Sequence, residues 1–296
     1  MTEHIFIVGA TGNVGSNIVR QLLEKKSRVT IYVRNPAKAT DLFPGQESLL
    51  SIVQGDYSDL TPFNNAITKG FTRLLLLVQV DRLDMSMAEL KSRMATAAYN
   101  SGVKQVVDIS SYCAGERWRN SCSSADHWAS EKALLEIPNR GRLVCLRPGR
   151  FMSNIVNFDK YSINQQSVYP GSSDPSETIA WVSPRDISTV AARILTESIE
   201  KHQDSVYEMI GQAMTASQTG EVISKVLGRN VPYVQVEPLE RYRLLTEVAH
   251  LPHSVAYFLV NLNENDVHTS RGLHILLGRK PETLEEYLTA HKHQFD

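Results

Sequence analysis

The sequence predicts an α/β protein with a doubly wound parallel sheet and a smaller carboxy-terminal α/β domain. The first observation is the apolar run Ile5–Val8, which is typical of a strand buried on both faces of a parallel sheet. The second is a glycine-rich turn, followed by apolar residues at helical spacing from Val14 to Leu23. The third is the alternation of predicted strands and helices, which continues to about residue 150.

The turn after the first strand carries three glycines at three-residue spacing. Strand, turn and helix together form the fingerprint of a Rossmann dinucleotide-binding fold, in which a pyrophosphate sits against N–H groups at the helix start. We expect a side chain at Gly9 or Gly12 to block the cofactor, and one at Gly15 to push the helix off the strand. An ordinary strand–helix turn is the alternative. The predicted pyrophosphate contacts are Gly9, Thr11, Gly12, Asn13, Val14 and Gly15.

The second predicted strand, Arg28–Val33, ends where proteins of this fold contact the adenosine ribose. An acidic residue there would bind the ribose hydroxyls of NAD, but the sequence has Arg34, with Lys38 nearby. Two cations suit a 2′-phosphate, which predicts NADP(H) in preference to NAD(H). A solvated surface arginine is the alternative. Asp56, after the third strand, is predicted either to accept from the adenine amine or to cap the next helix.

Further strands are predicted across the first half of the chain, with helices between them. Ligands of open α/β sheets bind at the carboxyl ends of the strands. We therefore expect Val80 and Ser110 to contact the cofactor, and Tyr112 to lie beside it. The predicted strands are Leu49–Gln54, Leu74–Val78, Val103–Ile109 and Arg142–Leu146; residues Arg117–Ala125 are predicted as a loop and Asp126–Glu136 as a helix.

Beyond Gly149 the predicted strands and helices no longer alternate regularly. Phe151–Ser176 is polar and predicted to be irregular, and the next helix is predicted to open near Trp181. Short strands at Val206–Ile210 and Val231–Val236 and a helical tail follow. We expect residues 1–150, with about 178–205, to form the NADP-binding domain. Residues 151–177 and 206–296 would form a substrate-binding lid, with the active site between the two domains.

Composition excludes several classes of function. A formal net charge of −1 argues against a nucleic acid or a membrane surface as partner. No apolar run approaches the length of a membrane span, and no signal peptide is apparent. Three cysteines in this context suggest the cytoplasm, and no set of residues has metal-ligand spacing. We expect a monomer or homodimer that binds a small molecule and no metal.

The ordered motifs resemble the NmrA-like branch of the atypical short-chain dehydrogenases/reductases. The resemblance implies an NAD(P)-binding Rossmann domain with a small carboxy-terminal domain. Members reduce quinones, azo compounds or phenylpropanoids, or tailor secondary metabolites, while others bind the cofactor as regulators without turning it over. The motifs lie at residues 9–15, 33–36, 55–56, 109–111, 127–132, 146–154, 183–187 and 277–287.

The chain departs from the superfamily at its catalytic helix. Ordinary members use a Tyr-x-x-x-Lys pair, in which the lysine holds the nicotinamide ribose and the tyrosine moves the proton. Here Trp128 stands four residues before Lys132, and the chain contains no Tyr-x-x-x-Lys. An indole is neither an acid nor a base near neutral pH. We still expect Lys132 to hold the ribose, with Trp128 on the substrate side.

Three mechanisms stay open at this point. Tyr112, Asp126 or His127 supplies a proton, or the substrate accepts hydride directly, as an iminium ion or an electron-poor quinone would. Alternatively, the protein is a non-catalytic NADP(H) redox sensor that regulates a partner protein. We favour an NADP(H)-dependent oxidoreductase acting on a quinone, imine, enone or secondary-metabolite intermediate, because Phe151 and Asn154 suggest an enclosed substrate pocket.

Overall fold

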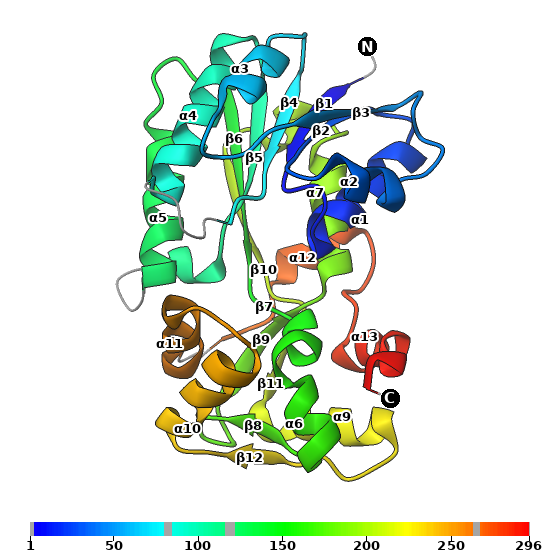
Figure 1. Cartoon of the computed structure of the whole chain (residues 1–296), viewed down its shortest axis with the longest axis vertical. Helices are drawn as coiled ribbons and strands as arrows, with labels where there is room; N and C mark the ends of the chain where they lie inside the picture. Colours follow the sequence, from blue (N-terminus) through cyan, green and yellow to red (C-terminus); the bar gives the residue numbers. More distant parts are fainter. Residues whose placement is uncertain (1–2, 80–84, 116–121, 263–266, 296) are drawn as a thin grey trace. The chain divides into compact units, whose positions relative to one another are not determined.

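The computed structural model describes residues 3–79, 85–115, 122–262 and 267–295 (Figure 1). Contacts divide the chain into two units, and each is described by itself. The first holds the described residues of Met1–Asn120, Ser124–Arg147 and Ile187–Glu208. The second holds those of Ser121–Ser123, Pro148–Asp186 and Met209–Asp296.

The first unit is built on a seven-stranded sheet in the order β10-β6-β5-β4-β1-β2-β3. From β6 to β3 every neighbouring pair is parallel, which confirms the predicted doubly wound α/β fold. Residues Ile5–Val8 of β1 are fully buried, as expected for the centre of a covered sheet. The strands are β1 His4–Val8, β2 Arg28–Val33, β3 Leu50–Gln54, β4 Arg73–Leu76, β5 Gln105–Ile109, β6 Arg142–Pro148 and β10 Ser205–Met209.

Helices cover both faces of this sheet. In Figure 1, α3, α4 and α5 lie on one side and α1 and α7 on the other. The Ser188 hydroxyl of α7 donates to the Val14 carbonyl of α1 over 3.0 Å, which ties the late helix to the first one. The helices are α1 Asn13–Glu24, α2 Pro36–Leu42, α3 Thr61–Ile67, α4 Met87–Asn100, η1 Tyr112–Ala114, α5 Cys122–Leu135, α7 Pro184–Ile194 and α8 Ile199–His202.

The second unit contains two small sheets and several short helices. Strand order is β11-β9-β7 in one sheet and β12-β8 in the other. Reciprocal capping boxes at Thr215 and Thr283 start α9 and α13. The elements are β7 Arg150–Phe151, η3 Ile155–Asp159, α6 Lys160–Gln166, β8 Tyr169–Gly171, β9 Thr178–Val182, β11 Gln212–Thr215, α9 Ala216–Leu227, β12 Tyr233–Gln235, α10 Pro238–Arg243, η4 Leu244–Val248, α11 His253–Asn261, α12 Arg271–Leu277, α13 Leu284–Ala290 and η5 Lys292–Phe295.

Two predicted segments are wrong in detail. The stretch predicted as irregular after Phe151 instead forms η3, α6 and β8. The sequence predicts Trp181 at a helix start, but the residue lies in β9, where it is 1% exposed. Its indole donates to the Thr219 hydroxyl of α9 over 3.3 Å, so strand and helix share one core. Helix α7 then begins at Pro184, a residue suited to the first turn.

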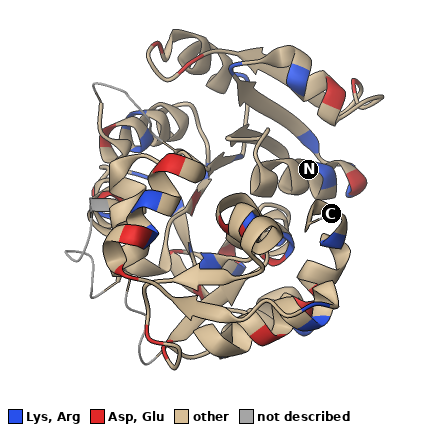
Figure 2. Cartoon of the chain, turned by 60° about the horizontal axis from the view of Figure 1, so that its bottom comes forward, with Lys and Arg blue, Asp and Glu red and all other residues tan. Residues whose placement is uncertain are grey.

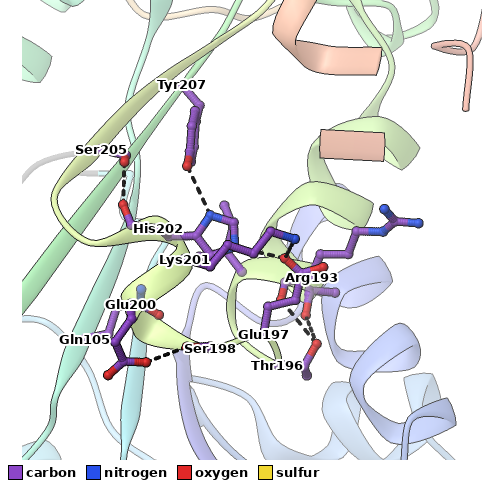
Figure 3. Close-up of polar contacts among 12 residues, drawn as sticks. Gln105, Arg193, Thr196, Glu197, Ser198, Glu200, Lys201, His202, Ser205 and Tyr207 are labelled. Carbon is purple, nitrogen blue, oxygen red and sulfur yellow. Dashed lines mark hydrogen bonds and ion pairs between the residues drawn. The ribbon is translucent and has the colours of Figure 1, made fainter. Parts of the chain in front are cut away.

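The connection from α7 to the edge strand β10 is held by a buried histidine (Figure 3). The His202 ring lies 3.1 Å from the Tyr207 hydroxyl through Nδ1 and 3.0 Å from the Glu197 carboxylate through Nε2. Arg73 of β4 donates to the Glu197 carbonyl over 2.9 Å. His202 therefore joins α8, β10 and the chain after α7 into one hydrogen-bonded corner.

Replacing His202 by leucine is expected to lower the free energy of unfolding by about 1–3 kcal/mol, because Tyr207 and Glu197 lose a buried partner. Urea titration would measure this change. Lys201→Gln is the control, since its side chain is 61% exposed and such surface changes stay within about 0.5 kcal/mol. Equal unfolding midpoints for the His202 variant and the wild type would contradict this account of the corner.

Candidate functional site

The turn between β1 and α1 leaves the start of the helix open to a ligand. Gly12 is the N-cap residue, and no side chain of the described residues caps the helix. The first turn also has no acidic residue. Gly12 and Asn13 are exposed. The unsatisfied N–H groups and the positive end of the helix dipole therefore face outward together, as an anion site requires.

Two of the three glycines are explained by the protein itself. Gly9 has φ +85°, and a Cβ there would lie 2.1 Å from the Leu77 carbonyl oxygen. A Cβ on Gly15 would lie 2.0 Å from the Gly9 carbonyl oxygen, so helix α1 could not approach the turn. This clash supports the expectation that a side chain at Gly15 would push the helix off the strand. The expectation that a side chain at Gly9 would block the cofactor needs correction, because such a side chain would clash with Leu77, directly after β4.

Gly12 differs from both. A Cβ there would meet only the Gly9 carbonyl oxygen, at 3.9 Å, and its φ of −84° suits any residue. The space around Gly12 is thus left open by the protein, at the point where a pyrophosphate would approach. Thr11 is half-buried beside it, and the Val14 side chain is buried in the core, so Val14 offers a ligand only its backbone N–H. These residues fit a dinucleotide.

Arg34 and Lys38 lie at the carboxyl edge of β2, as predicted, and both side chains are exposed. Asn35 caps α2 by accepting from the Lys38 backbone N–H over 3.2 Å. This cap fixes the short turn between the two cations. No hydrogen bond or ion pair with another described residue holds the Arg34 guanidinium, so it can turn toward an added phosphate.

Asp56 does not cap the following helix. Its carboxylate accepts from the Ser58 backbone N–H and hydroxyl, over 3.0 and 2.9 Å, and these bonds hold the pKa of Asp56 below its usual range. Asp59 instead accepts from the Thr61 N–H at the start of α3. An adenine contact for Asp56 stays a prediction. Val80, the other predicted contact of this region, lies outside the described residues.

The helix α5 turns Glu131 toward the carboxyl ends of β5 and β6. The Ser110 hydroxyl donates to Glu131 Oε1 over 2.5 Å. Arg147 donates to both carboxylate oxygens, through Nε over 2.9 Å and Nη2 over 2.6 Å. Ser110 is 4% exposed and its N–H donates to the Leu146 carbonyl. The Ser110 hydroxyl is therefore buried and already donates to a protein carboxylate, which argues against the predicted cofactor contact.

Trp128 and Lys132 lie on the same helix as Glu131. Lys132 Nζ stands 5.3 Å from the Trp128 ring centroid and 3.9 Å from the Glu136 carboxylate. Both side chains line an open hollow of about 340 Å³, which we call the α5–β10 hollow, and Glu131 and Arg147 line it as well. The ribose contact of Lys132 stays a prediction. The hollow's other apolar walls are Leu135, Leu143, Cys145 and Val206.

The NmrA-like family model matches residues 1–288 of the chain. The chain belongs to the NmrA-like family. This membership confirms the resemblance seen in the ordered motifs.

Several characterised proteins are similar to this NmrA-like chain. The NAD(P)H azoreductase of Xenophilus azovorans is 25% identical over 253 residues, covering 85% of this chain and 83% of that protein. The NADPH-dependent quinone oxidoreductase QOR2 of Escherichia coli, complexed with NADPH, is 25% identical with a TM-score of 0.81, covering 98% and 99%. The triphenylmethane reductase of Citrobacter sp., complexed with NADP(H), is 24% identical with a TM-score of 0.79, covering 97% and 99%.

His127 is poorly suited to donate a proton in this NmrA-like protein. Burial and the nearby Lys91 ammonium lower the pKa of His127 to about 3. The imidazole is therefore neutral at neutral pH, and it has no labile acidic proton to give. Its Nδ1 is buried and makes no hydrogen bond with another described residue. Of the proposed donors, His127 is the one that the structure argues against.

The other two proposed donors differ in setting. Asp126 is on the first turns of α5, and burial raises the pKa of its carboxyl. Tyr112 lies in η1, three residues after β5 ends, and is half-buried. The Ser111 hydroxyl, which accepts from the Cys113 N–H, fixes the start of that turn. Both stay candidates for a proton donor.

Phe151 and Asn154 belong to the second unit. Phe151 ends the two-residue strand β7 and is half-buried. Asn154 precedes η3 and lines a narrow cavity of about 30 Å³, together with Asp159 and Arg241. Asp159 and Arg241 form a buried ion pair at 2.7 Å, which keeps this small cavity polar. The predicted substrate contacts of Phe151 and Asn154 stay predictions.

Among the described residues, no helix has the length and apolar character needed to cross a membrane. Among the same residues, no three His, Cys, Asp or Glu side chains gather as metal ligands. In the view of Figure 2, Lys and Arg are interspersed with Asp and Glu along the helices.

Proposed function

We propose that this chain is an NADP(H)-dependent oxidoreductase that reduces a medium-sized organic acceptor such as a quinone or an iminium ion. The observation that carries the proposal is the open Gly12 position at an uncapped helix start, directly after β1, an inner strand of the sheet. The relatives named as azoreductase and quinone oxidoreductase support the reaction class.

The chain's own residues would bind and orient the cofactor. The N–H groups at the start of α1 would hold the pyrophosphate, with Gly12 leaving room for it. Arg34 and Lys38 would hold the 2′-phosphate that distinguishes NADP from NAD. When bound, the nicotinamide supplies a hydride. Phe151 and Asn154 stay predicted substrate contacts.

The preferred substrate class takes account of the loss of one of the three predicted donors. His127 is neutral at neutral pH, so only Tyr112 and Asp126 stay candidates for a positioned acid. A carbonyl needs a proton as it accepts hydride, which a positioned acid normally supplies. An electron-poor quinone or a cationic iminium accepts hydride first and can take any proton from water. We therefore place these acceptors before simple ketones.

The direct test is oxidation of NADPH, followed by absorbance, with a panel of quinones, iminium compounds and simple ketones. We expect turnover with quinones or iminium ions and little with simple ketones. Tight NADPH binding without oxidation by any acceptor would overturn the reductase and favour a redox sensor. Faster reduction of simple ketones than of quinones would contradict the proposed substrate class.

Replacing Arg34 by alanine is expected to weaken NADPH binding by about 10- to 100-fold and NADH binding by less than about twofold. The reason is the loss of charge-assisted hydrogen bonds to the 2′-phosphate alone. Calorimetric titration with both cofactors would measure the two ratios. Arg28→Ala, at the opposite end of β2, is the matched control. Equal losses for both cofactors would remove the basis for NADP preference.

A further inference from the structure

The α5–β10 hollow has the walls of a small-molecule site. It lies within the first unit, between helix α5 and the neighbouring strands β6 and β10. Its volume of about 340 Å³ falls at the lower end of the range for ligand pockets. Leu135 and Val206 remain 56% and 52% exposed at its walls. A ligand that covers these two side chains and packs against Trp128 would remove apolar surface from water.

The charged side chains that line the hollow differ in how closely they are paired with opposite charges. Glu131 and Arg147 neutralise one another at 2.6 Å. The Asp204 carboxylate is held by Arg140 at 2.8 Å. Among the described residues, Lys132 has only Glu136 as a counter-ion, at 3.9 Å, and their side chains are 54% and 63% exposed. Lys132 is therefore the lining cation most available to an added anion.

The position of Lys132 also indicates the shape of the ligand. Its ammonium stands near the Trp128 ring, as in a cation–π contact. A flat ring packed on Trp128 would bring a carboxylate or sulfonate on its edge toward the same ammonium. Leu143 and Cys145 of β6 supply an apolar floor for the ring.

We infer that the α5–β10 hollow binds a planar aromatic anion, with Trp128 stacking on the ring and Lys132 pairing with the acidic group. This site is separate from the Gly12 turn and goes beyond the proposed function, on which it does not depend. A neutral ring of the same size would use the apolar walls alone and gain nothing from Lys132.

Two matched fluorescent probes test the inference on the full chain: anilinonaphthalene sulfonate and N-phenylnaphthylamine, which lacks the sulfonate. Lys132→Gln is expected to weaken the sulfonate probe by about fivefold or more, with less than about a twofold change for the neutral probe. Lys132→Arg should restore the sulfonate probe. Trp128→Leu should weaken both probes, and Trp128→Phe should retain most of their binding. Glu136→Gln, directly after the end of α5, is the control and should not weaken either probe.

Saturating NADPH separates this inference from the proposed function. Simultaneous binding of NADPH and the sulfonate probe supports a site distinct from the cofactor. Displacement of the probe by NADPH would overturn the inference, as would equal effects of Lys132→Gln on both probes. If the chain binds the probe as expected but does not bind NADPH, the proposed function is wrong and the inferred site in the α5–β10 hollow is still supported.

Discussion

Replacing Gly12 by valine is expected to weaken NADPH binding by about 100-fold or more, a loss of about 2.7 kcal/mol, while the protein still folds. The protein leaves space for the added side chain, since a Cβ there meets no described atom closer than 3.9 Å. The valine methyl groups would fill the approach of the pyrophosphate instead. A less favourable N-cap residue should lower the melting temperature by only a few degrees. Calorimetric titration and thermal melting would measure the two effects.

Two further glycine substitutions make this result specific. Gly272→Ala in α12 places its Cβ in open space, so it should leave binding unchanged and raise the melting temperature slightly. Gly15→Val would drive a side chain into the Gly9 carbonyl and should prevent folding. Wild-type affinity in Gly12→Val would show that no phosphate approaches this turn.

Replacing Lys91 by methionine is expected to destabilise the fold by about 3–5 kcal/mol, because it leaves a buried carboxylate without its cation. Lys91 Nζ lies 2.7 Å from Asp108 Oδ1, and neither side chain is exposed. Lys91 also donates to the Ile109 carbonyl over 3.2 Å. Urea titration at fixed pH would measure the loss.

The deficit of Lys91→Met should depend on pH. Burial raises the pKa of Asp108, and the Lys91 ammonium opposes that rise. Without Lys91 the folded-state pKa lies further above the unfolded value. The variant therefore retains stability at low pH, where Asp108 is protonated in both states, and loses it as pH rises toward the folded-state pKa. The loss in free energy of unfolding relative to the wild type should be larger at pH 8 than at pH 5.

A double replacement and a surface control complete this test. Lys91→Met with Asp108→Leu removes both charges and should recover part of the lost stability. Arg93→Gln, on the same helix with a side chain 58% exposed, should change stability by less than about 0.5 kcal/mol. Equal losses for Lys91→Met and Arg93→Gln would contradict the importance of the buried pair.

The first unit could be predicted because its signals are local. Residues Ile5–Val8 form a strand that is apolar on both faces, and the glycine turn precedes a helix with a regular apolar stripe. The predicted strand Arg28–Val33 agrees residue for residue with β2. Each of these features depends on neighbours within about ten residues, so spacing alone reveals it.

The direction of side chains on α5 could not be predicted in the same way. The sequence places Trp128 and Lys132 four residues apart, and also His127 and Glu131. Both pairs lie on one face of a helix, and spacing does not say which face meets the sheet. The direction of the Glu131 side chain depends on two partners far away in the sequence, Ser110 directly after β5 and Arg147 on β6.

The second unit was harder to predict for a related reason. Its strands are short and pair across long stretches of chain, as β9 does with β11. Trp181 and Val182 closely precede a helix-starting proline, so the sequence indicates the start of that helix at the place where the structure has the end of a strand. Pairing partners, which decide strands of this length, leave no signal in a local window.

The bond between Ser188 and Val14 has a consequence for biosynthesis. The first unit takes α7 and most of β10 from residues 187–208, after the chain has passed through much of the second unit. A nascent polypeptide released from the ribosome at residue 150 would lack both the covering helix and the edge strand. The first unit is therefore complete only after synthesis has passed residue 208, and we expect an amino-terminal fragment that ends at residue 150 to bind a dinucleotide more weakly than the full chain.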